Sequence, residues 1–354
     1  MASHVTALSL VGLALAAAAM AADEPTRRWS PEQARAWSEK QPWLCGFNFV
    51  PSSAVNTTEM WQADTFDAAL IERELGWAEK IGFNSCRVFV QYIVWKHDPD
   101  GLKKRLEQFV AIADRHGLSV MPVLFDDCAF AGKEPYLGRQ DDPVPGVQNS
   151  GWTPSPGHKL VADRAAWPDL ERYVAALVGQ FARDRRVVLW DLYNEPGNSG
   201  TGGKSLALVR ACFGWARQAR PTQPLTIGVW NGGLREYNDA QIELSDIVSF
   251  HNYGNLDAVR GQTAALRAHE RPIICTEWMA RPLGSRFETH LPLFKNEKVG
   301  CYSWGLVNGR TQTQFPWGTK KGTPEPKLWF HDVLRRDGTP YLPAEIEAIG
   351  AATR

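Results

Sequence analysis

Two hydrophobic patterns alternate along the chain. Short apolar runs are typical of buried parallel strands, and longer segments with apolar residues every three or four positions are typical of amphipathic helices. The short runs predict eight strands, and most of them end in polar residues. These strands are Trp43–Val50, Asn84–Val90, Leu118–Phe125, Val187–Pro196, Leu225–Trp230, Asp246–His251, Arg271–Met279 and Val299–Leu306.

Helical segments separate these runs. They are predicted at Glu32–Lys40, Leu70–Lys80, Leu102–His116, Pro168–Phe181, Ser205–Arg220, Asp239–Leu244, Asn255–His269, Phe287–Asn296 and Glu325–Arg336. Strands that alternate with helices form parallel βαβ units. Eight such units in a chain of this length predict the α/β class and a single (β/α)8 TIM barrel.

The barrel is predicted to span residues 42–340. Residues 1–22 resemble a signal peptide, because Val5–Ala19 is apolar and Ala19-Met20-Ala21 offers small residues at the cleavage spacing. Residues 23–41 form a lead-in and residues 341–354 a C-terminal tail. Cys128–Trp167 has no clear periodicity, and so long a loop in a compact domain is usually functional or disordered.

Composition excludes several classes of partner. The formal net charge is zero, so nothing indicates nucleic acid or a charged membrane surface as a partner. No run after the leader is apolar enough to span a bilayer, and a secreted or periplasmic location is expected. The six cysteines lack metal-ligand spacing, and the sequence does not decide whether any two of them form a disulfide.

Two glutamates carry the candidate chemistry. Glu195 follows the fourth predicted strand, and Glu277 ends the apolar run of the seventh. Side chains at the C-terminal ends of barrel strands face the substrate site. Cleavage of a glycosidic bond needs one protonated and one ionised carboxyl group. We assign Glu195 the acid/base role and Glu277 the role of nucleophile.

Neighbouring residues support this assignment. Asn194 is positioned to bind a sugar hydroxyl beside the acid, and Arg87, if it reaches the barrel mouth, holds a carboxylate ionised. Tyr253 and His251, at the end of the sixth strand, are candidates to bind or tune the pair. The remaining candidates for substrate binding are strand-end or loop residues that offer polar atoms or aromatic faces: Asn48, Asp126, Trp152, Trp304 and Trp317.

Residues 43–335 resemble a clan A glycoside hydrolase, closest to the family 5 cellulase and mannanase group. The resemblance rests on Arg87, Asn194-Glu195-Pro196, His251-Asn252-Tyr253, Thr276-Glu277-Trp278 and Trp304, in this order. It implies a retaining mechanism, Trp304 as a sugar platform, and neither metal nor organic cofactor. It departs at the end of the third strand, where Asp126-Asp127 stands in place of the His that family 5 enzymes often carry.

The predicted function is a retaining β-glycoside hydrolase that acts on oligo- or polysaccharides of the glucan, mannan or xylan type. Two alternatives remain open. A metal-dependent sugar isomerase would use Glu195, His251, Glu277 and an aspartate as ligands. A non-catalytic glycan-binding barrel is the other, although such a protein would be expected to lack one of the two carboxylates.

Overall fold

The computed structural model describes residues 27–354. Its centre is one sheet of eight parallel strands in the order β5-β4-β3-β2-β1-β8-β7-β6. The strands are β1 (Cys45–Phe49), β2 (Ser85–Phe89), β3 (Ser119–Asp126), β4 (Trp190–Asn194), β5 (Leu225–Thr226), β6 (Val248–His251), β7 (Ile273–Trp278) and β8 (Gly300–Trp304).

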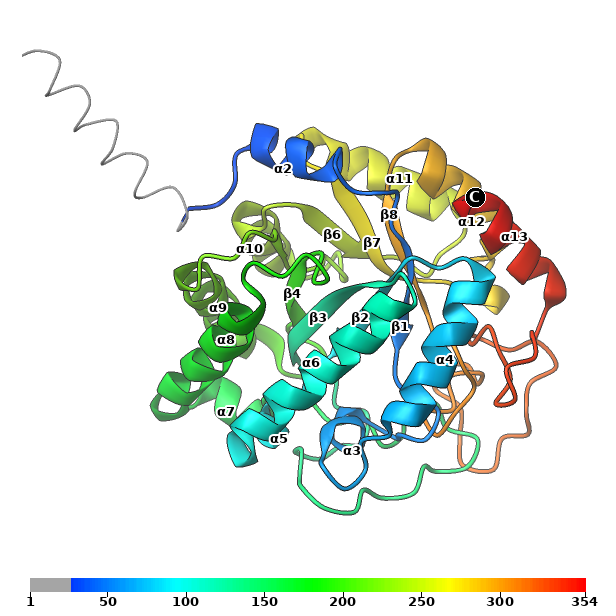
Figure 1. The fold of residues 1–354 in the computed structure, drawn as a ribbon, viewed down its shortest axis with the longest axis horizontal. Helices are drawn as coiled ribbons and strands as arrows, with labels where there is room; N and C mark the ends of the chain where they lie inside the picture. The colour runs from blue at the N-terminus through cyan, green and yellow to red at the C-terminus, as the bar shows by residue number, and fades with distance from the viewer. Residues whose placement is uncertain (1–26) are drawn as a thin grey trace, which may run out of the picture.

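The two edge strands, β5 and β6, approach each other and nearly close the ring. Beyond β5, the Val229 amide donates to the Ser249 carbonyl, and the His251 amide donates to the Val229 carbonyl, each at 2.9 Å. Sequential parallel strands in a nearly closed ring, with helices outside them (Figure 1), confirm the predicted (β/α)8 barrel.

The helices outside the ring bury one face each. They are α3 (Thr57–Trp61), α4 (Ala68–Ile81), α5 (Tyr92–His97), α6 (Pro99–Arg115), α7 (His158–Ala162), α8 (Trp167–Phe181), α9 (Leu206–Gln218), α10 (Arg235–Leu244), α11 (Leu256–Leu266) and α12 (Phe287–Asn296). Local sequence sets their ends: at α4, the Asp67 carboxylate accepts from the Leu70 amide, and Gly82 ends the helix with φ +112°.

The lead-in covers the end of the barrel opposite the long loops. Helix α2 (Pro31–Ser38) lies at the top of Figure 1. Its buried Ala34, with Trp29 and Trp37, packs on the amino-terminal part of the barrel interior, which includes Met121 and Ile274. The amino-terminal end of the barrel is therefore sealed, and the opposite end remains for a site.

The structure corrects three details of the predicted elements. Strand β5 is only two residues long, and the short helices α3, α5 and α7 were not predicted. The helix expected at Glu325–Arg336 is absent. Instead, Arg281 donates hydrogen bonds to the carbonyl groups of Trp329, His331 and Asp332. Asp332 also has φ +44°. The segment therefore cannot form the internal hydrogen bonds of a helix.

The tail 341–354, expected to be an appendage, is instead a helix packed on the barrel. Helix α13 (Pro343–Thr353) contacts α12 and α4. Its Glu345 forms a bidentate ion pair with Arg281, with N–O distances of 2.7 and 2.6 Å. Both side chains are buried. Since Arg281 also organises residues 329–332, the C-terminal helix supports the loop after β8.

Glu345→Ala is expected to lower the free energy of unfolding by about 3–5 kcal/mol, because it leaves the buried Arg281 without its counter-ion. Urea unfolding followed by tryptophan fluorescence measures the change. Glu347→Ala, on the exposed side of the same helix, is the control and should stay within about 0.5 kcal/mol of the parent. A loss below about 1 kcal/mol for Glu345→Ala would contradict the structural role given to the pair.

All six cysteines are buried and free. Within residues 27–354, no helix has the length and apolar character needed to cross a membrane. The predicted signal peptide, residues 1–22, lies outside the described residues.

Candidate active site

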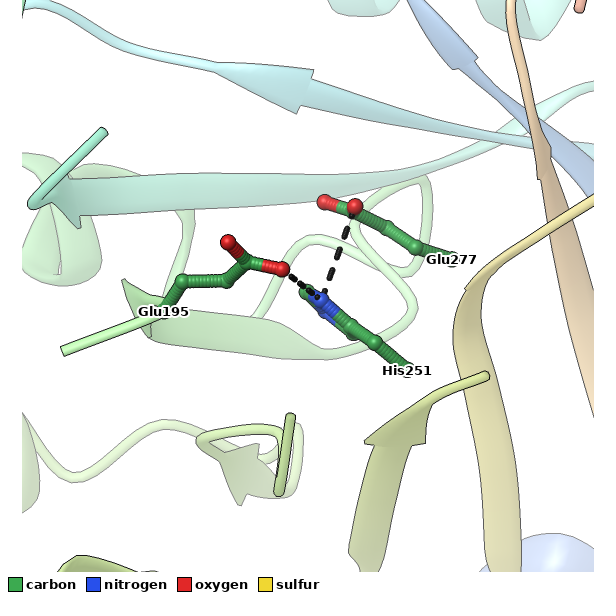
Figure 2. A group of neighbouring side chains, drawn as sticks. All are labelled: Glu195, His251 and Glu277. Atoms are coloured by element: carbon green, nitrogen blue, oxygen red, sulfur yellow. Dashed lines mark hydrogen bonds and ion pairs between the residues drawn. The ribbon is translucent and has the colours of Figure 1, made fainter. Parts of the chain in front are cut away.

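A cavity of about 1180 Å³ opens at the carboxyl ends of the strands. Side chains from β4, β6, β7 and β8 and from the loops after β3 and β8 line it, and Glu195 and Glu277 are both among them. Figure 2 shows these two glutamates and His251 converging from three strand ends. The two glutamates predicted from the sequence therefore do share one cavity.

Glu195 is presented by a tight turn that leaves β4. The residue has φ +42°, which is uncommon for any residue other than glycine. Asp127, just beyond β3, holds this turn: its carboxylate accepts from the Gly197 amide at 2.7 Å and from the Tyr193 hydroxyl at 2.7 Å. Asp127 is buried and so fixes the direction in which Glu195 leaves the strand.

Glu277 faces the cavity because β7 contains a bulge. Phe250 of β6 pairs with Cys275, but the next residue, His251, pairs with Glu277, so β7 carries one extra residue. Both Cys275 and Trp278 belong to the core between barrel and helices. Strict alternation along a strand would turn Glu277 to the same face as Cys275. The bulge shifts that alternation and aims Glu277 inward.

Arg87 of β2 is fully buried and joins the two halves of the site. Its Nη1 donates to Oε1 of Glu277 at 2.7 Å and to Oδ1 of Asn48 at 2.8 Å. Its Nη2 donates to Oδ1 of Asn194 and to Oδ2 of Asp191, each at 2.8 Å. One guanidinium thus serves two buried carboxylates, and it fixes Glu277 by a charge-assisted hydrogen bond.

Glu277 has a second strong donor. The Tyr253 hydroxyl donates to its Oε2 at 2.8 Å, and burial keeps the pKa of Tyr253 well above its usual value, so this donor keeps its proton. Burial also raises the pKa of Glu277, and the contact with Arg87 opposes that increase. The partners of Glu277 therefore favour its ionised form.

Glu195 has partners of a different kind. Its Oε2 accepts from Nδ2 of Asn198 at 2.5 Å and from Sγ of Cys128 at 3.4 Å. Its Oε1 lies 2.8 Å from Nδ1 of His251, whose pKa burial lowers to about 4, so the imidazole is neutral at neutral pH. Burial raises the pKa of Glu195, and none of these partners is a cation. Glu195 therefore lacks the cationic contact that favours the ionised form of Glu277.

The two carboxyl groups are close together. One oxygen of Glu195 and one of Glu277 lie within 4.8 Å of each other, and His251 lies between them. Retaining glycosidases place their carboxyl groups about 5–5.5 Å apart, whereas inverting enzymes need about 6.5–9.5 Å to admit a water molecule. The spacing fits direct attack by one carboxylate while the other carboxyl group transfers a proton.

Glu195, His251 and Glu277 also have the composition of a metal site, and no other such group of three occurs within residues 27–354. Two contacts oppose a cation here. Oε1 of Glu277 already pairs with the Arg87 guanidinium, and Oε2 already accepts from Tyr253. A divalent cation bound to Glu277 would lie next to a fixed positive charge.

The substrate-binding candidates fall into two groups. The cavity lining includes Asn194, His251, Tyr253, Trp152, Trp304 and Trp317. Three others, expected to contact substrate, lie beneath the lining and hold residues that belong to it. These three are Arg87, Asn48 and Asp126.

Asp126 illustrates this supporting position. Its carboxylate accepts from Nδ2 of Asn194 at 2.9 Å, from Nε1 of Trp152 at 2.7 Å and from the Cys128 amide at 2.9 Å. Burial raises the pKa of Asp126 to about 6. Asn48 similarly accepts from Arg87 and donates to the Thr276 carbonyl at 2.9 Å. Both therefore fix the geometry of the cavity from below.

Sequence reasoning missed several lining residues. Asn198 and Cys128 contact Glu195 directly, and Trp230 and His331 also line the cavity. Trp230 closes the fifth predicted strand, so its place at a strand end was an available signal. His331 carried none, because its segment was predicted to be helical.

The comparisons with known proteins agree with this geometry. Residues 53–314 match the family profile Cellulase (glycosyl hydrolase family 5). No curated protein matches the sequence significantly.

Several solved structures share the fold at low sequence identity. An exo-β-1,4-mannosidase from Opitutaceae bacterium strain TAV5 is 18% identical, with a TM-score of 0.62, over 88% of this chain and 59% of that chain. The GH5_18 protein from Streptomyces cattleya in complex with Manb1-4GlcNAc is 14% identical, with a TM-score of 0.59, over 89% and 80%. An endo-β-1,4-mannanase from Thermotoga petrophila is 13% identical, with a TM-score of 0.58, over 90% and 77%.

The family profile covers most of the chain and includes both glutamates. Membership of a hydrolase family favours a glycosidase over the two alternatives considered from the sequence, the isomerase and the non-catalytic barrel. The chain belongs to glycosyl hydrolase family 5 and is a glycosidase.

Proposed function

We propose that the protein is a retaining β-glycoside hydrolase in which Glu277 is the nucleophile and Glu195 the acid/base. One observation carries the proposal: two buried carboxyl groups have oxygens within 4.8 Å of each other, but only one of them touches a cation. Unequal surroundings of this kind separate the pKa values of two carboxyl groups and so separate their roles.

The reaction proceeds in two steps. In the first, a carboxylate oxygen of Glu277 bonds to the anomeric carbon while the bond to the leaving oxygen breaks, and Glu195 gives that oxygen its proton. In the second, Glu195 takes a proton from water, the water oxygen bonds to the anomeric carbon, and the bond to Glu277 breaks. Arg87 and Tyr253 hold Glu277 in position throughout.

The proposed substrates are β-linked glycans of the glucan, mannan or xylan type. The aromatic side chains of Trp152, Trp304 and Trp317 line the cavity and offer apolar faces to sugar rings. Mannan-type glycans are the first to assay, because two of the structurally similar proteins are named as a mannosidase and a mannanase.

Glu195→Gln is expected to abolish the basic limb of the pH–activity profile. Activity of the parent requires protonated Glu195, so it should fall as pH rises through a pKa that burial raises above the usual glutamate value. The variant should lose about 10²–10⁴-fold in kcat/KM on substrates with a poor leaving group. Aryl glycosides whose leaving group needs no proton should be much less affected in the first step.

The control for this measurement is Glu236→Gln, an exposed glutamate on α10, which should leave the profile unchanged. A basic limb that persists unchanged in Glu195→Gln would contradict the acid role.

We further propose that the protein acts outside the cytoplasm. The support is the apolar leader Val5–Ala19 followed by small residues at the cleavage spacing. Protein recovered from the producing cells should then begin near Ala22, whereas an intact Met1 would contradict export.

A further inference from the structure

Two loops at the carboxyl end of the barrel bound one side of the cavity, and a third loop fastens them from behind. They are residues 138–151 from the loop after β3, 309–323 from the loop after β8, and 52–62 after β1, and we call them together the closed rim. The long loop after β3 lies at the end of the barrel opposite α2 (Figure 1).

The loops after β3 and β8 are joined directly. Gln312 bridges them: its Oε1 accepts from the Gly146 amide at 3.0 Å, and its Nε2 donates to the carbonyls of Val144 and Val147 at 2.8 and 3.0 Å. The Gly322 amide also donates to the Pro145 carbonyl at 2.8 Å. At least four hydrogen bonds therefore hold these two loops together.

The loop after β1 fastens both of the others. The Arg310 amide donates to the Ser52 carbonyl at 3.0 Å. On the other side, Nδ2 of Asn56 donates to the Gly151 carbonyl and to Oε1 of Gln140, each at 2.9 Å. The boundary thus runs without a break from β8, over β1, to β3.

The closed rim contributes polar side chains to the cavity lining. Gln148, Asn149 and Thr319 are all among the lining residues. A terminal sugar presents several hydroxyl groups, and a polar lining suits such a ligand better than an apolar one.

The opposite part of the boundary is built differently. The connections after β5 and β6, residues 227–234 and 252–255, are short. Within residues 27–354, no hydrogen bond joins residues 230–234 or 252–255 to the loops after β3 and β8. Only the ring of Tyr253 touches the closed rim, edge-on against Trp317 with the ring centroids 5.0 Å apart. Trp230 and Asn252 line the cavity on this side, which leaves it as the side where a chain can extend.

We infer that the enzyme is exo-acting and removes sugar units from the non-reducing end of a β-linked glycan, with the terminal sugar against the closed rim. This inference rests on the proposed retaining mechanism. In that mechanism the leaving chain must depart, and water must replace it, before the covalent intermediate is hydrolysed. The leaving chain therefore belongs on the open side, and the glycosyl unit attached to Glu277 belongs on the side of the rim.

The test compares two sets of β-1,4-linked hexasaccharides, of mannose and of glucose, each with a fluorophore at the reducing end. One set has a free non-reducing end, and the other carries a 4,6-O-benzylidene group there. On the free set, the first labelled product should be one or two units shorter than the hexamer. Capping should slow cleavage by at least about 100-fold, which corresponds to about 2.7 kcal/mol of lost transition-state binding.

Three results would overturn the inference. Cleavage of capped and free hexamers at similar rates, or labelled trimers as the first products, would show internal cleavage. Early release of the labelled terminal sugar would show attack from the other end. A protein that cleaves neither set, nor a xylan-type hexamer, would contradict the proposed function itself.

A variant of the rim tests the cause. Gln312→Ala removes the three hydrogen bonds of the bridge, and the ratio of capped to free cleavage should rise by at least about tenfold. Gly146→Ala is a second way to part the loops, because its Cβ would lie 2.5 Å from the Thr323 carbonyl oxygen. Gln180→Ala is the matched control. It removes the hydrogen bond from Gln180, on the exposed side of α8, to the Lys103 carbonyl and should leave the ratio unchanged.

Thermal unfolding of each variant shows whether it folds. If Gln312→Ala and Gly146→Ala both fold and cleave the free hexamers but still reject the capped ones, the closed rim is not what blocks internal binding, and the inference fails.

Discussion

Replacing Glu277 with glutamine is expected to lower kcat/KM by at least about 10⁴-fold, because the amide keeps the volume of the side chain but cannot attack the anomeric carbon. The fold should survive, since the amide oxygen can still accept from Arg87 and the amide NH2 group can donate to the Tyr253 hydroxyl oxygen. Circular dichroism and thermal unfolding check the fold, and hydrolysis of an aryl β-glycoside and of the labelled hexamers measures the loss. Glu288→Gln, an exposed glutamate on α12, is the matched control.

The same role predicts a covalent intermediate. A 2-deoxy-2-fluoro glycoside with a good leaving group should inactivate the parent enzyme and label the peptide that contains Glu277, as seen by mass spectrometry. NMR of the first product should show the anomeric configuration of the substrate. Label on another residue, an inverted product, or a loss below about 100-fold in Glu277→Gln would contradict the assignment.

Replacing Arg87 with methionine is expected to be nearly as damaging, by a different route. Methionine fills part of the space but leaves Asp191 and Glu277 buried without their cation. Removing one partner of a buried ion pair costs about 3–5 kcal/mol of folding free energy. Glu277 would also lose the contact that opposes the rise of its pKa. The acid limb of the pH–activity profile should therefore move to higher pH, because activity requires this carboxyl group to be ionised.

Urea unfolding and the pH dependence of kcat/KM measure the two effects. Arg172→Met, at an exposed surface ion pair, is the control and should cost about 0–1 kcal/mol. Adding Asp191→Asn to Arg87→Met should recover part of the lost stability, because it removes one of the two stranded charges. An Arg87→Met protein with parent-like stability and an unshifted acid limb would contradict the role given to this network.

Strands β4 and β7 differ in how far the local sequence determines where their glutamates point. The end of an apolar run in Asn194-Glu195-Pro196 was enough to place Glu195 at the mouth of a parallel barrel, since such strand ends share one face. Glu277 was predicted to lie there by the same argument. Its inward direction, however, depends on the bulge in β7, and period-2 alternation alone gives the opposite face.

The supporting network was hidden for a similar reason. Asp191 lies between Trp190 and Leu192 in an apolar run, and nothing in that run indicates that it pairs with Arg87 of β2. In the same way, a helix was predicted at Glu325–Arg336, whereas Arg281, paired with Glu345, holds that segment in an irregular conformation. Contacts between distant parts of the chain decided both cases.

The sequence by itself determined the barrel, the order of its strands, and the two glutamates at its mouth, because hydrophobic periodicity and strand ends are local properties of the chain. The tertiary structure alone decided which way Glu277 points, which carboxylates share Arg87, and which loops close the rim of the cavity. Those features depend on pairing register and on hydrogen bonds between residues far apart in sequence, such as Gln312 and Gly146, and no local pattern encodes them.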